Sequence, residues 1–217
     1  MLTKVSSNLW VYNSTFCTAC FKGSTRMTVV RLKDGKLWVH SPLEITEGVK
    51  EELQHLGDVA YVVAPNNMHY MYFQRFLEVF PQAEGYVAPS LVEKKPAFGQ
   101  YQPLSELKHV VGREIQQTEF QGHTLGETAF FHKPSKTLIV ADLLYNIQPT
   151  NLPLEKGVMW VFGAYGKAAI PFYHKVAMKD KQAIQASGEM FCAPRQPNLG
   201  GLGALKKDCP RSMETGG

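Results

Sequence analysis

The stretch GHTLGETAFFHKPSKTLIVAD, residues 122–142, decides the fold of this chain. Phe130 and Phe131 lie in a short β-prone run, residues 133–136 supply a turn, and residues 137–141 form an apolar run typical of a buried strand. His123 and Asp142 therefore lie at the ends of neighbouring strands, which can project from one edge of a sheet. Imidazole and carboxylate groups that converge there are metal ligands, although a strand-end aspartate also serves as a turn cap.

A second hairpin is predicted upstream of this stretch. The β-prone runs 26–32 and 36–40 flank the dipeptide Asp34-Gly35, which is typical of a tight hairpin turn. The second run stops before Pro42, which has no amide N–H to donate, so His40 is expected at a strand terminus. Thr46 is expected to cap the helix that follows, and Gly57 to end it.

The next segment predicts a buried strand followed by a helix. Residues 59–64 are an apolar run of the kind found in a strand that is covered on both faces. Asn66 or Asn67 is expected to cap a helix over residues 68–80, with His69 in its first turn. The order strand, strand, helix, strand, helix, strand favours an α/β sandwich in which helices cover mixed sheets.

The bulk composition suits a single soluble domain. The chain has 217 residues and a net charge of +4, and its Lys and Arg residues are scattered. No basic cluster interleaves with aromatics, which argues against nucleic-acid binding. No apolar run is long enough to span a membrane, and residues 1–10 lack the charged-then-apolar layout of a signal peptide, so a cytoplasmic location is expected. The predicted organisation is an irregular lead-in over 1–25, a domain over 26–190 and a loose Gly/Pro-containing tail over 191–217.

Two further features are interpreted as structural. Cys17-Thr18-Ala19-Cys20 is a lone CxxC without the second pair that a zinc ribbon needs, so reduced structural thiols are expected. His132 is interpreted as a surface residue.

At this point the residues support a named resemblance. The run 122–126 (GHTLG), with 130–132 (FFH) and 138–142 (LIVAD), resembles the third and fourth metal motifs of the metallo-β-lactamase superfamily. The runs 27–32, 37–42 and 64–69 resemble a divergent family of unknown function within that superfamily. The resemblance covers residues 26–190 and implies an αββα sandwich with mixed sheets. It also implies that His123 and Asp142 are metal ligands.

The sequence departs from the superfamily pattern at two places. Superfamily enzymes carry a His-x-His-x-Asp-His cluster after the strand at 59–64, where this chain has PNNMHY, residues 65–70, so that only His69 remains as a ligand. The superfamily also closes its site with a late histidine, and no histidine follows His174 here. The C-terminal part is therefore expected to be incomplete or divergent relative to the superfamily.

Three functions remain open from the sequence. The expected one is a non-catalytic member that has lost its metal and serves as a binding module for an unknown small-molecule ligand. The alternative is a hydrolase of an ester, thioester, lactone or phosphoester that holds one zinc, iron or manganese ion. Its ligands would be His40, His69, His123 and Asp142, and Asn66 would support them by a hydrogen bond. The third is redox chemistry through Cys17 and Cys20, a possibility that rests on the single CxxC.

Overall fold

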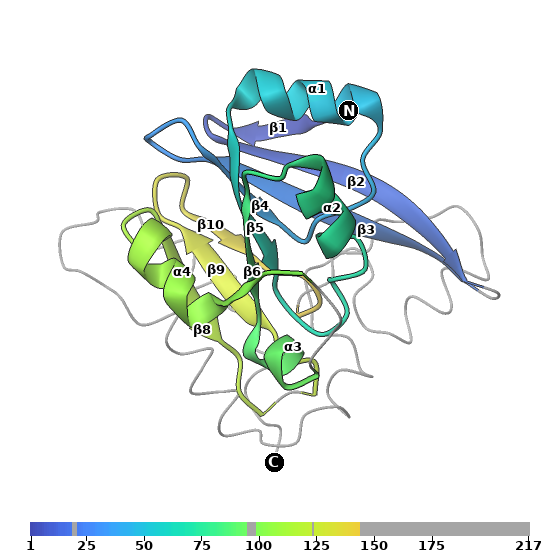
Figure 1. Cartoon of the computed structure of the whole chain (residues 1–217), viewed down its shortest axis with the longest axis vertical. Helices are drawn as coiled ribbons and strands as arrows, with labels where there is room; N and C mark the ends of the chain where they lie inside the picture. The colour runs from blue at the N-terminus through green and yellow to red at the C-terminus, as the bar shows by residue number, and fades with distance from the viewer. Residues whose placement is uncertain (19–20, 95–98, 123, 144–217) are drawn as a thin grey trace, which may run out of the picture. The chain divides into compact units, whose positions relative to one another are not determined.

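The computed structural model describes residues 1–18, 21–94, 99–122 and 124–143 (Figure 1). These residues divide into two units. The first comprises Met1–Gln117 with Leu125–Ala141, and the second contains Thr118–Thr124 and the residues from Asp142 onward. The predicted tail over 191–217, the remainder of the predicted domain from residue 144 and Cys20 lie outside the described residues, so those predictions stay open.

A seven-stranded mixed sheet is the centre of the first unit. Its strands lie in the order of the chain. They are β1 (Thr3–Ser6), β2 (Leu9–Thr18), β3 (Phe21–Arg31), β4 (Leu37–His40), β5 (Val59–Ala64), β6 (Glu84–Val87) and β7 (Gln102–Pro103). Neighbours from β1 to β4 are antiparallel, and neighbours from β4 to β7 are parallel. The carboxyl ends of β4, β5 and β6 consequently meet at one edge of the sheet.

The predicted hairpin over 26–40 is confirmed. β3 and β4 pair with Val30 opposite Trp38, and Gly35 adopts a φ of +88° in the turn between them. Only glycine reaches that region without strain, which explains the Asp-Gly dipeptide. The buried strand over 59–64 is also confirmed, because every residue of β5 except Ala60 is buried.

The predicted irregular lead-in over 1–25 is wrong. These residues form β1, β2 and the start of β3, and Leu9 and Val11 are buried while Trp10 and Tyr12 are less so. The alternation is that of a half-buried strand. Polar residues such as Asn13 and Ser14 interrupt its apolar pattern, and this hides the strand in the sequence.

Four short helices connect the strands of the sheet. They are α1 (Glu47–Leu56), α2 (Phe73–Val79), α3 (Pro89–Lys94) and α4 (Leu104–Val111). α1 begins as predicted, because the Thr46 hydroxyl accepts a hydrogen bond from the amide of Val49 at 3.4 Å. The helix predicted over 68–80 begins only at Phe73. The Asn66 side chain closes a turn at residues 66–69 instead of capping a helix.

A three-stranded sheet lies against the mixed sheet. Its order is β10 (Thr137–Ile139), β9 (Thr128–His132), β8 (Ile115–Glu119). The predicted hairpin is confirmed, with Phe130 opposite Ile139. The Phe130 ring packs edge-on against Trp38 of β4 with ring centroids 5.0 Å apart, so apolar residues of the two sheets form one core. His132, predicted at the surface, faces this interior and is fully buried.

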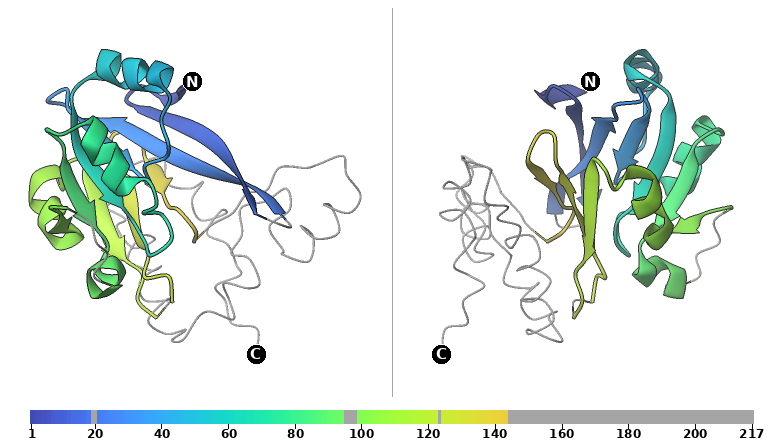
Figure 2. Two further views of the ribbon diagram at one scale, coloured as in Figure 1. Left: turned by 45° about the vertical axis from the view of Figure 1, so that its right-hand side comes forward. Right: turned by 90° about the vertical axis from the view of Figure 1, so that its left-hand side faces the viewer.

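A second apolar core lies on the other face of the mixed sheet. α1, α2 and α3 cover that face, as Figures 1 and 2 show from three directions. Val49 and Leu53 of α1 and Phe73 and Phe76 of α2 pack there against β3, β4 and β5. The described residues thus form layers of helices, sheet and sheet. Among them, no helix has the length and apolar character that crossing a membrane requires.

Candidate functional site

The candidate site lies at the edge where the parallel strands end. Ser41 follows β4, Asn66 and His69 follow β5, and Ser90 lies in α3 just after β6. Ligands of α/β proteins commonly bind at the carboxyl ends of such strands. The amide of Ser41 donates to the carbonyl of Val63 at 2.9 Å, which continues the ladder between the two strands up to the edge itself.

Ser41 and His69 are in direct contact at this edge. The hydroxyl Oγ of Ser41 forms a hydrogen bond with Nδ1 of His69. Ser41 is buried and has a φ of +56°, a left-handed conformation that costs a non-glycine residue about 1 kcal/mol. Strain of this kind persists only where surrounding contacts impose it. The contact at Nδ1 fixes the orientation of the His69 imidazole.

Asn66 and Glu127 form a buried polar pair beside this contact. Both side chains are fully buried. Nδ2 of Asn66 donates to Oε2 of Glu127 at 3.2 Å, and Oδ1 of Asn66 accepts from the amides of Met68 at 2.9 Å and His69 at 2.8 Å. Oε1 of Glu127 accepts from the amide of Ala141 at 2.7 Å. One carboxylate therefore ties the loop after β5 to the segment after β10.

The loop that leads into β9 is held against the same edge. The amide of Thr128 donates to the carbonyl of Pro65 at 2.9 Å, and the hydroxyl of Ser90 donates to the carbonyl of Gly126 at 3.0 Å. Gly126 has a φ of +55°, and a Cβ at this position would lie 2.3 Å from Cβ of Ser90. Glycine is therefore required here both for its backbone conformation and for the close approach of α3.

The structure describes three of the four predicted metal ligands. His40 lies in the interior, where its ring stacks on Trp38 with centroids 5.6 Å apart and meets Phe130 edge-on at 5.4 Å. His69 lies at the strand edge against Ser41. Asp142 is buried and belongs to the second unit. His123 lies outside the described residues, so the full ligand set stays a prediction.

Among residues 1–18, 21–94, 99–122 and 124–143, no three His, Cys, Asp or Glu side chains form a group that could hold a metal ion. Asn66, predicted to support a ligand by a hydrogen bond, accepts two backbone hydrogen bonds at its amide oxygen, from Met68 and His69. These two bonds shape the loop after β5.

Sequence reasoning missed two residues of this edge. Nothing in the sequence indicated that Glu127 is buried, because glutamate rarely is. The residues around it in the loop also suggest no partner for its carboxylate. Ser41 directly follows His40, and its position between a strand end and Pro42 was a hint of an unusual backbone. Only the structure shows that the hydroxyl meets an imidazole 28 residues away.

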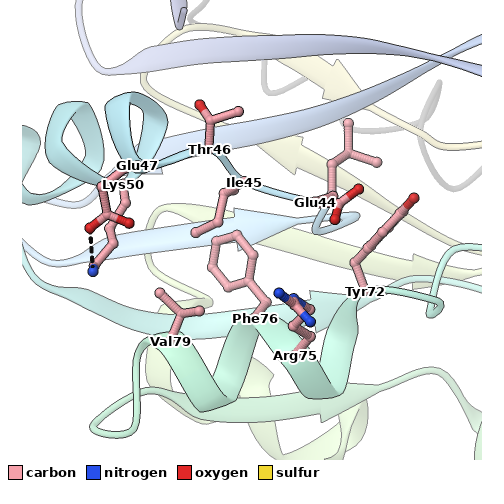
Figure 3. Close-up of a pocket in the computed structure, with 10 residues that line it drawn as sticks. Glu44, Ile45, Thr46, Glu47, Lys50, Tyr72, Arg75, Phe76 and Val79 are labelled. Atoms are coloured by element: carbon pink, nitrogen blue, oxygen red, sulfur yellow. Dashed lines mark hydrogen bonds and ion pairs between the residues drawn. The ribbon is translucent and has the colours of Figure 1, made fainter.

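A pocket of about 150 Å³ lies apart from this edge, between α2 and the segment that leads into α1. Figure 3 shows the Phe76 ring in its middle, with the Glu47–Lys50 pair on one side and Glu44, Tyr72 and Arg75 on the other. Glu47 and Lys50 form an ion pair of 2.6 Å. Of the described residues, none forms an ion pair with Glu44 or Arg75. Two opposite charges therefore face solvent beside an apolar floor that includes Ile45 and Val79.

Solved structures identify the class of fold. The chain is similar to the metallo-β-lactamase from Pontibacter korlensis, with a TM-score of 0.54 and 13% identity over 88% of this chain and 83% of that one. DIM-1 metallo-β-lactamase matches with a TM-score of 0.56 and 14% identity, over 87% of this chain and 81% of that one. A Nostoc sp. PCC 7120 fragment described as diflavin flavoprotein A 5 matches with a TM-score of 0.54 and 10% identity, over 89% and 84%. The chain therefore has the metallo-β-lactamase fold, and the predicted fold class is confirmed.

The comparison with protein-family models matches a shorter part of the chain than the solved structures do. A family model described as a domain of unknown function (DUF4336) matches residues 6–93, which include the strands β2 to β6 and the edge with Ser41, Asn66 and His69. No curated protein matches the chain significantly. The resemblance to a divergent family of unknown function within this fold is thereby supported, and the activity is not determined by it.

The first prediction concerns the glycine at the edge. Gly126→Ala should lower the free energy of unfolding by about 2 kcal/mol or more, since it combines left-handed strain with a clash against Ser90. Gly48→Ala is the matched control, because it lies in α1 with open space around it and should stabilise by about 0.5–1 kcal/mol. Urea unfolding measures both. Equal effects of the two substitutions would contradict the assigned role of Gly126.

The second prediction concerns the buried pair. Asn66→Ala should cost about 3 kcal/mol, because it removes the bond that Asn66 donates to the buried carboxylate of Glu127 and leaves the amides of Met68 and His69 without their acceptor. Gln54→Ala on the exposed face of α1 should change stability by less than about 0.5 kcal/mol. A loss of under about 1 kcal/mol for Asn66→Ala would show that the pair is not a structural link.

Proposed function

We propose that this chain is a divergent metallo-β-lactamase-fold protein that serves as a non-catalytic binding module. The observation that carries the proposal is the Asn66–Glu127 pair. It occupies the loop where the resemblance implies the His-x-His-x-Asp-His cluster, and its hydrogen bonds hold the loop without a metal. A hydrolytic centre needs several convergent ligands and an activated water, and this loop supplies His69 alone.

The position of His40 supports the same proposal. A metal ligand must present a nitrogen lone pair to a site that water or substrate can enter. His40 is 1% exposed and its ring packs between Trp38 and Phe130. That packing suits a core histidine. The competing proposal is a single zinc, iron or manganese ion bound by His40, His69, His123 and Asp142, which would activate water for hydrolysis.

The pocket beside Phe76 is the proposed binding site of the module. Arg75 offers a guanidinium that can bind a carboxylate through two parallel hydrogen bonds, and Glu44 offers an acceptor for an ammonium group. The apolar floor takes a hydrocarbon side chain. A cavity of about 150 Å³ is of the size that takes benzene, so it can hold the hydrocarbon side chain of a small ligand whose charged groups lie at the rim beside Arg75 and Glu44. An apolar amino acid meets these conditions.

The third prediction tests the proposal through metal content. Purified full-length protein should contain well under one zinc, iron or manganese ion per chain. Added metal should not raise its melting temperature, whereas a true ligand at a hundredfold excess over Kd stabilises by about 2.7 kcal/mol. Elemental analysis and thermal unfolding measure both. Stoichiometric metal that is lost in His123→Ala and Asp142→Ala, but kept in the control His55→Ala on α1, would establish the competing proposal.

The fourth prediction tests the binding site. Leucine should bind weakly, in the millimolar range expected for exposed charges (about −4 kcal/mol), as measured by amide chemical shifts in NMR spectra. Leucinamide and N-acetyl-leucine lack the carboxylate and the ammonium respectively, and should bind at least several-fold more weakly. Arg75→Gln and Glu44→Gln should abolish binding, and Lys50→Gln should preserve most of it. Absence of shifts around Phe76 with any apolar amino acid would refute this site.

A further inference from the structure

His132 and Glu114 each bury a polar atom that has no hydrogen-bond partner among the described residues. His132 ends β9 and is fully buried, with Nε2 in the interior. Glu114 immediately precedes β8, and its Oε2 is buried as well. Buried polar atoms are nearly always satisfied by protein or by ordered water, so each of these needs an explanation. Neither residue takes part in the edge or the pocket.

The hydroxyl groups beside His132 determine its tautomer. Thr137 donates its hydroxyl hydrogen to the carbonyl of Ser135 at 3.2 Å, and Ser135 donates its hydroxyl hydrogen to Oγ1 of Thr137 at 2.8 Å. Each hydroxyl has one hydrogen. Oγ of Ser135 must therefore be the acceptor in its 2.6 Å contact with Nδ1 of His132. Nδ1 carries the ring proton, and neutral His132 presents a lone pair at Nε2.

Glu114 presents a second acceptor near this lone pair. Its Oε1 accepts from the amide of Lys33 in the β3–β4 turn at 3.1 Å, and its carbonyl accepts from the amide of Lys133 at 2.9 Å. A carboxylate only accepts, so Oε2 also requires a donor. Because Lys133 directly follows His132, the hydrogen bond from the Lys133 amide places the backbone of Glu114 beside the end of β9. The Glu114 carboxylate also offsets part of the lowering of the His132 pKa that burial causes.

We infer that a buried water molecule is bound between His132 and Glu114, donating one hydrogen to Nε2 and the other to Oε2. A water molecule has the two donors that this pair of acceptors requires, and no hydroxyl or amide of the described residues supplies them. When His132 is protonated, its own Nε2–H becomes the donor to Glu114. The site is therefore a proton-sensitive link between the second sheet and the β3–β4 turn. It is independent of the proposed function.

The direction of the pH effect follows from burial. Burial lowers the pKa of His132 from its usual value of 6.5, and the Glu114 carboxylate offsets this in part. The charged groups on neighbouring elements are Lys33, Lys36 and Asp34 of the β3–β4 turn and Lys133 and Lys136 of the β9–β10 turn. The Glu114 carboxylate is the charged group that acts on the His132 pKa, and its effect is smaller than that of burial. The unfolded chain therefore binds the proton first, and stability is lost as the pH falls from 6.5 to the folded pKa.

The fifth prediction tests the tautomer and the water directly. Imidazole nitrogen chemical shifts of the full chain at neutral pH should show that His132 is protonated at Nδ1 and unprotonated at Nε2. A high-resolution crystal structure should show a water molecule within hydrogen-bond distance of Nε2 and of Glu114 Oε2. A proton on Nε2 at neutral pH, or an empty space between the two atoms, would overturn the inference.

Variants distinguish the effect of the His132–Glu114 link on stability from the effect of other groups that are protonated at low pH. Glu114→Gln should lower the pKa of His132 further, whereas Glu119→Gln, which removes the same charge from the exposed end of β8, should leave it unchanged. His132→Gln supplies a permanent donor to Glu114 and should remove the loss of melting temperature that wild type shows below pH 6.5. Equal pKa shifts in the two glutamate variants, or an unchanged pH profile in folded His132→Gln, would count against the link.

Discussion

The buried carboxylate of Glu127 is the constraint on which the candidate site depends. A carboxylate removed from water is costly unless hydrogen bonds compensate it, and Glu127 is fully buried. Asn66 and the amide of Ala141 provide that compensation, and they come from segments 75 residues apart in the sequence (141 minus 66). The pair therefore sets the position of the loop after β5. That loop in turn carries His69 to the hydroxyl of Ser41.

Local patterns in the sequence predicted most of the described fold. Asp34-Gly35 and the turn at residues 133–136 predicted two hairpins, and the apolar run 59–64 predicted the buried parallel strand β5. The errors have physical causes. β2 was missed because polar residues interrupt its apolar alternation. The helix over 68–80 began too early, because the oxygen of Asn66 can close a turn as well as cap a helix, and only tertiary contacts decide between them.

The site was less predictable than the fold, because it depends on pairs that are distant in the sequence. His69 was correctly expected at the carboxyl end of a strand, since periodicity places strand ends. Its partner Ser41, the buried Glu127 and the interior position of His132 each require knowledge of which elements pack together. No propensity of Ser, Glu or His indicates such a partner. A buried acid in particular contradicts the ordinary expectation for glutamate.

The Asn66–Glu127 pair also explains how the fold can be stable when the loop after β5 lacks the His-x-His-x-Asp-His cluster. In a metal centre, the bonds between the ion and its ligands cross-link loops that would otherwise separate, and the binding free energy of the ion becomes folding free energy. Here the links between the loop after β5 and its neighbours are hydrogen bonds among Asn66, Glu127, Thr128 and backbone groups. Such links require tight local geometry, because each depends on short contacts in fixed directions. The close approach of Gly126 to Ser90 and the left-handed backbone of Ser41 are two places at this edge where that requirement is met.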